Sequence, residues 1–445
     1  MYRLYSMLTA LCAVTALAAG QSLAPKDFTL KNGMKVIMLE DRTVPSVCLS
    51  MAVRAGSRYE RPGMTGISHL FEHMMFNGSK NYKPTEFDRI LETGGGYSNS
   101  TTWSDLTFYY EEFSPDLLDK VLDMEADRIR ALKIDAENLE QERGIVKEER
   151  RVSVDNNVQS TMFEDLYAMA YVAHAYRTPI VGWMKDLDNI TLQDARDYFK
   201  SYYAPNNATV VVVGAFDGKP LRQKMERMFG SIPQQPAPRA VNNPEPPQAG
   251  ERRELLHKVA ELPAVAIGYK VVSASSPDFA PLTLLANILS QGESSRLYKR
   301  LVYDEQLATG VSCSADERID PGLFTLYVQM QPDKSVKDAE SELKDILEDI
   351  VENGVSDEEL QKAKNQAQMQ YADEMKTNVG IASRLGRYEV IHGGYQKSFD
   401  MLSEYARVTA EDIKRVTRQY LSDRLRSVVV LVPEKADTSS RNPTN

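Results

Sequence analysis

The segment from residue 66 to residue 76 reads Gly66-Ile67-Ser68-His69-Leu70-Phe71-Glu72-His73-Met74-Met75-Phe76. Residues three and four apart share one face of a helix, so His69, Glu72 and His73 would point the same way. The apolar residues between them can pack inward, which favours a helix with one buried face. Two neutral imidazoles at this spacing can bind one Zn²⁺, and a carboxylate beside them can accept a proton from water. The segment therefore predicts a helix that carries part of a zinc hydrolase site.

The order of these residues, H-x-x-E-H, is that of the inverted zinc peptidases. The alternative is a pair of solvent-facing histidines that bracket a glutamate by chance. The chain has only 5 His, so such a chance match should arise on the order of once in a few hundred sequences. His174, His257 and His392 show no ligand spacing, and we expect them at the surface or packed. A zinc site usually has three protein ligands and a water, so a third ligand must come from elsewhere in the chain.

Composition limits the other function classes. The chain has 445 residues, of which 42% are hydrophobic and 26% charged, enough for two domains with sizeable cores. Its 53 basic and 63 acidic residues give a net charge of −10 without a long basic block, which argues against a nucleic-acid partner. Only 3 Cys occur, which rules out a disulfide framework as the source of stability.

The N-terminus predicts export. Residues 1–20 contain a single charge, Arg3, then an apolar run from Leu4 to Ala18 and small residues up to Gly20, the pattern of a cleaved secretory signal. A membrane anchor is the alternative, but the run is shorter than the ~20 apolar residues that a span requires. No later stretch is long and apolar enough to cross a bilayer, so we expect no membrane span after cleavage and a periplasmic protein. A eukaryotic secretory route would look similar.

The mature chain is predicted to consist of two related halves. Residues 21–232 form the N-terminal zinc-binding domain, 233–252 a proline-rich linker, 253–436 the C-terminal domain and 437–445 a disordered tail. Each half ends with a capping-box signal, at Thr191 and at Thr409, followed by a helix and a valine-rich run. This repetition indicates an α+β fold with two homologous α/β-sandwich-like domains that arose by internal duplication.

Local patterns predict the following elements. Residues 35–39 and 46–53 are expected to form a hairpin, 107–111 a further strand, and Gly94 to Gly96 a turn before an edge strand. Helices are expected over 137–169, 338–353 and 357–375.

The chain resembles the pitrilysin (insulinase) family of zinc metallopeptidases, in the branch of ~50 kDa subunits that includes the mitochondrial processing peptidases. Besides the zinc motif, the resemblance rests on the segment from Glu142 to Glu149, which is similar to the family's E-R-x-V-V-type helix. It implies one Zn²⁺ per chain held by His69, His73 and Glu149, and a clamshell of two halves. It also places Glu142, two turns earlier, among the catalytic machinery as a buried acid behind the ligands. Glu148 is the rival ligand, one residue out of register.

The resemblance extends over nearly all of the mature chain. Residues 99–110 are similar to the family's edge strand, which implies that substrate lies along Asn99, Ser100 and Thr101 as an added β-strand. Glu72 would be the general base in the hydrolysis of short or unfolded peptides, without a covalent intermediate. Further similar segments are 174–182, 203–209 and 292–297.

One departure bears on partners. After the 292–297 segment, single-chain relatives carry an Arg and a Tyr that approach the scissile carbonyl, and these places fall on Val302 and Thr309. Neither side chain can stabilise an oxyanion as Arg and Tyr do, and Tyr303 is one residue out of register. We therefore expect this chain to be the zinc-bearing subunit of a heterodimer whose paralogous subunit supplies the Arg and Tyr, with a homodimer as the alternative. The rival function is a non-catalytic peptide-binding or assembly subunit of the same fold. A presequence-processing subunit is disfavoured because the N-terminus is not rich in arginine.

Overall fold

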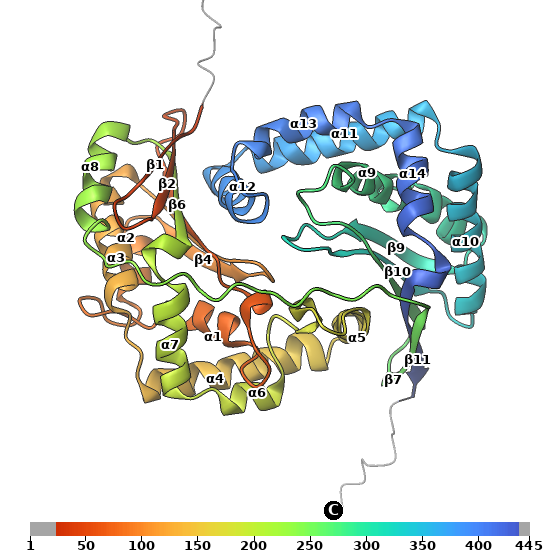
Figure 1. Ribbon diagram of the computed structural model, residues 1–445, viewed down its shortest axis with the longest axis horizontal. Helices are drawn as coiled ribbons and strands as arrows, with labels where there is room; N and C mark the ends of the chain where they lie inside the picture. Colours follow the sequence, from red (N-terminus) through yellow and green to blue (C-terminus); the bar gives the residue numbers. More distant parts are fainter. Residues whose placement is uncertain (1–23, 436–445) are drawn as a thin grey trace, which may run out of the picture.

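The computed structural model describes residues 24–435, so the predicted signal and tail lie outside the described residues. Two α+β halves lie side by side, each built around one β-sheet, and residues 233–249 cross between them without helix or strand (Figure 1). This confirms the predicted fold class. Within residues 24–435, none of the helices is both long and apolar enough to cross a membrane.

The two sheets share one topology. The N-terminal sheet has the order β1-β2-β6-β3-β5-β4 and the C-terminal sheet the order β7-β11-β8-β10-β9. In both sheets one parallel pair, β2 with β6 or β7 with β11, is followed by three antiparallel pairs, and β1 adds a fourth antiparallel pair to the first sheet. The matching order is what an internal duplication predicts, with β1 added to the first half. The strands are β1 (Lys26–Thr29), β2 (Lys35–Glu40), β3 (Val47–Val53), β4 (Tyr97–Thr102), β5 (Thr107–Phe113), β6 (Ala208–Gly214), β7 (Arg252–Val259), β8 (Ala264–Lys270), β9 (Ala308–Ala315), β10 (Leu323–Met330) and β11 (Arg426–Glu434).

The helices follow the amphipathic patterns of the sequence in most places. The capping boxes at Thr191 and Thr409 are both formed, and Gly94 to Gly96 turn the chain into the edge strand β4, as predicted. The helices are α1 (Ile67–Met74), α2 (Glu86–Thr93), α3 (Leu118–Ala131), α4 (Ala136–Arg150), α5 (Val158–Ala170), α6 (Met184–Asn189), α7 (Leu192–Tyr202), α8 (Gly218–Met228), α9 (Phe279–Ser290), α10 (Val336–Asn353), α11 (Asp357–Glu374), α12 (Asn378–Ile391), α13 (Lys397–Arg407) and α14 (Ala410–Tyr420).

The predicted hairpin is wrong, although both of its strands exist. β6 lies between β2 and β3, pairing parallel with the first and antiparallel with the second. Every residue of β6 and of β3 is buried, so both strands belong in the interior of the sheet with a neighbour on each side.

The predicted helix over 137–169 is also wrong as a single element. α4 ends at Arg150, a π-turn spans Arg151–Asp155, and α5 begins after the cap residue Asn157. The buried Arg150 guanidinium bonds both carboxylate oxygens of Glu164 and the carbonyl of Gly182. These contacts fold the helix back where the sequence pattern alone would continue it.

Each sheet is covered on one face by a helix that comes from the other half. Met162 and Leu166 of α5 pack on the C-terminal sheet against residues such as Ala266. Reciprocally, Ile381 and Leu385 of α12 pack on the N-terminal sheet. Figure 1 shows α12 between the two sheets, and α5 beneath the second one. Because the two halves exchange helices, neither sheet is fully covered by its own half.

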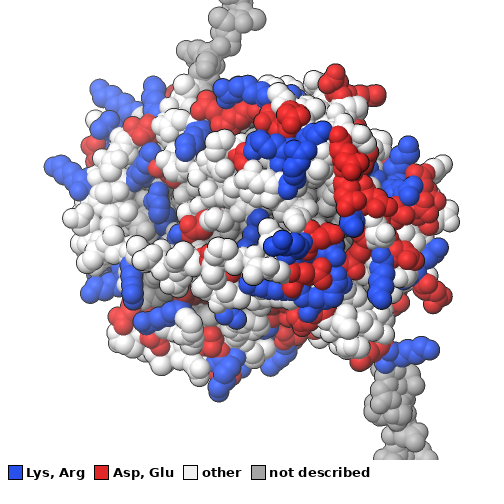
Figure 2. Space-filling model, turned by 45° about the vertical axis from the view of Figure 1, so that its right-hand side comes forward, with Lys and Arg blue, Asp and Glu red and all other residues white. Residues whose placement is uncertain are grey.

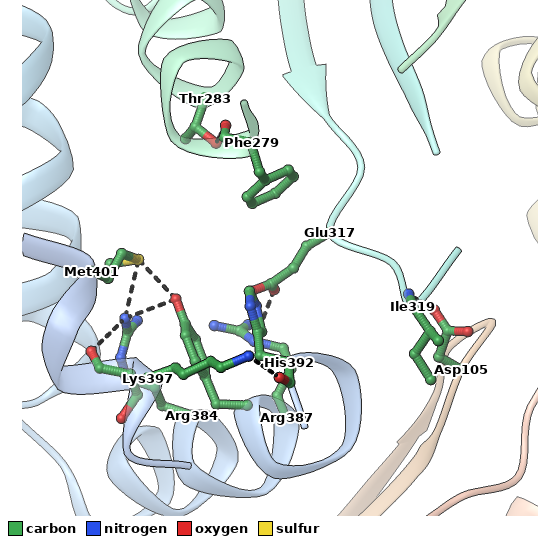
Figure 3. A network of polar contacts seen from close by, with 12 residues as sticks. Asp105, Phe279, Thr283, Glu317, Ile319, Arg384, Arg387, His392, Lys397 and Met401 are labelled. Carbon is green, nitrogen blue, oxygen red and sulfur yellow. Dashed lines mark hydrogen bonds and ion pairs between the residues drawn. The ribbon is translucent and has the colours of Figure 1, made fainter. Parts of the chain in front are cut away.

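Polar contacts join the halves as well. Within the second half, Glu317 in the loop after β9 pairs with His392 at 2.7 Å and with Arg387 at 3.0 Å at the C-terminal end of α12, the helix that packs on the first sheet (Figure 3). The backbone N–H of Ile319 in the same loop donates to Asp105, in the turn between β4 and β5. The loop therefore fixes the turn that ends the edge strand.

The linker is fastened by one carboxylate. Glu245 accepts hydrogen bonds from the backbone N–H groups of residues 172–174, and it pairs with Lys270 at 2.7 Å. It thus ties the first half, the linker and β8 together.

Figure 2 shows that basic and acidic side chains are interspersed on the exposed face of the molecule drawn there.

Candidate active site

Helix α1 carries the H-x-x-E-H motif and is fixed at both its start and its buried face. Gly66 precedes it with a positive φ of 87°, and a Cβ there would lie 2.4 Å from the carbonyl oxygen of Val181, so only glycine fits. The Glu60 carboxylate accepts from the N–H groups of Gly66 and Ser68, both at 2.8 Å, and so satisfies the free end of the helix. Leu70, Phe71 and Met74 are fully buried on the other face.

The two histidines meet a carboxylate from α4. His69 Nε2 lies 3.6 Å from Glu149 Oε1, and His73 Nε2 lies 3.3 Å from Glu149 Oε2. One ligand atom from each of the three side chains falls within 4.8 Å of the others. Two imidazole nitrogens and one carboxylate oxygen, with the residues on packed helices, form a donor set that suits a catalytic zinc ion. Glu148 turns away from this cluster and pairs with Arg151, with 64% of its side chain exposed.

Glu142 lies behind the cluster and fixes His73. Its Oε2 is 3.4 Å from His73 Nδ1, and its Oε1 accepts from Asn77 Nδ2 at 2.8 Å. This contact leaves Nε2 of His73 to face Glu149, the arrangement in which a carboxylate selects the tautomer of a ligating histidine. Glu142 is 5% exposed, so it acts on the site through His73 and has little access to a substrate.

The charges of the cluster favour a cation. Burial lowers the pKa of His69, which favours its neutral, ligating form. Burial also acts to lower the pKa of His73, but the carboxylates of Glu142 and Glu149 outweigh it and raise that pKa to about 9. The hydrogen bond from His73 in turn lowers the pKa of Glu149. Without a metal, a proton on His73 balances the carboxylates, and a metal ion would displace that proton.

Glu72 points from α1 toward the end of the edge strand. Its Oε2 accepts a hydrogen bond from Thr102 Oγ1 at 2.5 Å and lies 3.9 Å from His69 Nε2. Glu72 is thus beside the histidines and outside the ligand set, where a general base is needed. Sequence reasoning placed Thr102 in the edge strand within residues 99–110 but did not predict its hydrogen bond to Glu72. A hydroxyl at the end of that strand was the available signal.

The edge strand β4 has two different faces. Ser98 donates to Asp88 of α2 and Thr102 to Glu72 of α1, so the even-numbered residues face the helices of the site. Ser100 lies on that same face, whereas Asn99 and Thr101 alternate to the other. β4 pairs only with β5, so among the described strands its second edge is free for an added strand.

A cavity of about 300 Å³ adjoins this strand, lined by Phe76 and Leu91 together with Ser98 and Ser100. A larger cavity of about 740 Å³ lies under the linker, and none of the metal-cluster residues lines it. The metal-cluster residues do not line the smaller cavity either, but residues 97–100 of β4 do, so this cavity adjoins the edge strand.

The positions predicted to lack the Arg and Tyr lie in the second half. Val302 is in a π-turn over Tyr298–Asp304 and packs against the core, while Tyr303 is 75% exposed. Thr309, on β9, donates to the carbonyl of Gln329. The other histidines are placed as expected. His174 and His392 are buried beside carboxylates, and His257 is exposed.

Known proteins resemble this chain throughout both halves. A family model described as Insulinase (Peptidase family M16) matches residues 35–182, and one described as Peptidase M16 inactive domain matches residues 189–367. The zinc protease PqqE of Helicobacter pylori is 30% identical over 421 residues, which cover 93% of this chain and 94% of that protein. The mitochondrial-processing peptidase subunit beta of Lentinula edodes is 25% identical over 89% of this chain and 87% of that protein.

Solved structures show the same likeness through both halves. A protease from Helicobacter pylori matches with a TM-score of 0.88 at 29% identity, over 92% of this chain and 99% of that one. The periplasmic protease PqqL of Escherichia coli shares the fold, with a TM-score of 0.77 at 19% identity over 92% of this chain and 48% of that one. A likeness of this extent, carried through both halves and not by the motif alone, shows that the chain belongs to peptidase family M16, the insulinase family, several of whose relatives are named zinc proteases.

Proposed function

We propose that this protein is a zinc-dependent endopeptidase that hydrolyses short or unfolded peptides. The observation that carries the proposal is the convergence of His69, His73 and Glu149 within 4.8 Å, with Glu72 beside them. The names of the relatives support the same metal and the same class of reaction.

His69 and His73, through their Nε2 atoms, and the Glu149 carboxylate would hold the zinc ion. When bound, zinc supplies a Lewis acid that polarises the scissile carbonyl and makes water a stronger nucleophile. Glu72 accepts the proton that the attacking water releases and returns it to the leaving amine nitrogen. Glu142 keeps His73 in the ligating tautomer throughout.

The free edge of β4 would hold the substrate. Backbone groups of residues 99–101 can pair with an extended peptide, which gives affinity with little dependence on side chains. Ser100 faces the helices of the site, so its neighbourhood and the cavity beside Phe76 would receive alternate substrate side chains. A folded protein has few extended segments free to pair in this way, so unfolded chains are favoured.

The direct test is cleavage of a quenched ten-residue peptide by the zinc-loaded chain, with Glu72→Gln as the blank. The Gln variant should keep its zinc and lose turnover, because the amide cannot accept the proton. Cleavage by the variant at the wild-type rate would refute the role of Glu72. Zinc binding without turnover in any combination of subunits would favour the non-catalytic peptide-binding role.

We also propose that the chain works with a paralogous subunit that supplies an Arg and a Tyr. The support is that Val302 and Thr309 offer neither the guanidinium nor the phenol that would stabilise an oxyanion. Turnover should rise when the paralogue is added to the zinc-bearing chain. Full turnover by the isolated chain, undiminished against the mixture, would contradict this part, and a concentration-dependent homodimer would be the remaining arrangement.

The place of action is proposed to be the periplasm. The support is the apolar run and small-residue stretch of residues 1–20, together with a fold neighbour described as periplasmic. Fractionation of the native host should find the mature chain, shortened at its N-terminus, outside the cytoplasm; a full-length cytoplasmic protein would contradict the proposal.

A further inference from the structure

Thr102 makes the one hydrogen bond that the described chain provides to the Glu72 carboxylate. The residue is the last of β4 and is 7% exposed. Its hydroxyl donates to Glu72 Oε2 at 2.5 Å, a short contact. His69 Nε2, 3.9 Å from that oxygen, belongs to the metal cluster. Thr102 is thus what holds the orientation of this carboxylate.

The strand end that carries Thr102 is rigid. The N–H of Trp103 donates to the carbonyl of Leu106 at 2.8 Å and closes the tight turn between β4 and β5. Asp105, within that turn, accepts hydrogen bonds from the hydroxyl of Tyr176 and the N–H of Ile319. The position of the Thr102 hydroxyl is therefore set by contacts from both halves of the molecule.

The carboxylate that it orients is otherwise free to turn. A glutamate side chain has three rotatable bonds, and the last of them is soft. With Oε2 engaged by Thr102, Oε1 is the oxygen left to accept a proton. Without the hydroxyl, the carboxylate would sample orientations in which neither oxygen faces the attacking water, and misplacement of a catalytic group by about 1 Å can cost about 100-fold in rate.

We propose that Thr102 is a positioning residue for Glu72, which links the strand that binds the peptide to the group that moves the proton. The inference rests on the proposed peptidase function. It assigns Thr102 a role that differs from that of its neighbours: residues 99–101 would contact substrate, and Thr102 would act through Glu72.

Two substitutions separate this role from a structural one. Thr102→Val keeps the β-branched shape and removes the hydroxyl, and Thr102→Ser keeps the hydroxyl. Thr417→Val is the matched control, because Thr417 is also buried and its hydroxyl bonds only a backbone carbonyl in α14 of the other half. For each protein, kcat, KM and the number of zinc ions per chain are measured on the quenched peptide.

We expect Thr102→Val to lower kcat by about 10- to 100-fold, with KM within about 2-fold and one zinc retained. Thr102→Ser should recover most of the rate, and Thr417→Val should match the wild type. A Val variant with unchanged kcat, a loss that Ser does not rescue, or a loss that follows loss of zinc would overturn the inference.

Failure of the proposed function can be distinguished from failure of the role of Thr102. If the wild type shows no turnover above the Glu72→Gln blank with or without a partner, the peptidase assignment fails. Crystal structures of the wild type and Thr102→Val then decide the positioning role: a Glu72 carboxylate in one orientation in the wild type and in several in the variant supports it, and an unchanged carboxylate overturns it.

Discussion

Replacing Glu142 by Gln keeps the shape of the side chain but exchanges one accepting oxygen for a donating NH₂ group. Both oxygens of Glu142 are in use, one facing Asn77 Nδ2 at 2.8 Å and the other His73 Nδ1 at 3.4 Å. In the variant, one of these contacts sets two donors against each other. If Asn77 keeps its partner, His73 must give up the proton on Nδ1 and carry it on Nε2, which then has no lone pair for a metal.

The expected cost follows from the outer position of Glu142. Removing such a partner of a ligating histidine weakens metal binding by about 10- to 100-fold, or about 1.4–2.7 kcal/mol. The lower end applies if Asn77 turns its own amide over and relieves the conflict. The fold should survive, because the exchange adds no volume.

The measurement is a competition titration of zinc between the purified chain and a chromophoric chelator. Glu148→Gln is the matched control, since its carboxylate is on the same helix but faces Arg151 and solvent. We expect an unchanged zinc affinity for the control and a reduced one for Glu142→Gln. Wild-type affinity in Glu142→Gln, or a loss in the control instead, would refute the assignment of these two carboxylates.

Two further predictions concern stability. Leu166→Ala in α5 should lower the free energy of unfolding by about 2–5 kcal/mol in chemical denaturation, because this side chain is fully buried on the sheet of the other half. The control, Ile145→Ala on the exposed surface of α4, should cost under about 1 kcal/mol. Equal costs would contradict the exchange of helices. Burial acts to raise the pKa of Glu245, but Lys270 and the backbone N–H groups of residues 172–174 lower it to about 2 from an ordinary value of 4.5. A lowered pKa in the folded state means that the unfolded chain binds the proton more tightly, so Glu245 should contribute about 1–2 kcal/mol above about pH 5 and lose that contribution as the pH falls toward 2. The difference in unfolding free energy between wild type and Glu245→Gln should therefore shrink on acidification, and a difference that grows would show the sign to be wrong.

Much of the local structure could be predicted because its causes are local. The capping boxes at Thr191 and Thr409 form because a hydroxyl and a carboxylate three residues apart satisfy the first N–H groups of a helix. The spacing within α1 sets His69 and His73 on one face for the same kind of reason.

Long-range pairing could not be predicted in this way. Nothing in residues 35–53 indicates that β6, more than 150 residues later, inserts between the two strands of the expected hairpin. The apolar face of α5 likewise indicates burial but not which sheet covers it.

In the candidate site, too, the residues set by local spacing could be predicted and those set by packing could not. His69, Glu72 and His73 could be found from spacing, but the sequence around Glu149 is a run of charges that resembles a solvated helix face. Glu149 was assigned from family resemblance, and its position beside the histidines depends on how α1 and α4 pack. The hydrogen bond from Thr102 to Glu72 could not be predicted, because a single threonine in a polar strand carries no pattern of its own.

The central claim is that His69, His73 and Glu149 bind one zinc ion. The most direct measurement is anomalous diffraction at the zinc edge from crystals of the zinc-loaded chain. The account predicts one peak about 2.0–2.2 Å from His69 Nε2, His73 Nε2 and a Glu149 oxygen, with Glu72 outside the ligand shell. The absence of a peak among these three residues, or a peak ligated by Glu148 or Glu72, would contradict it.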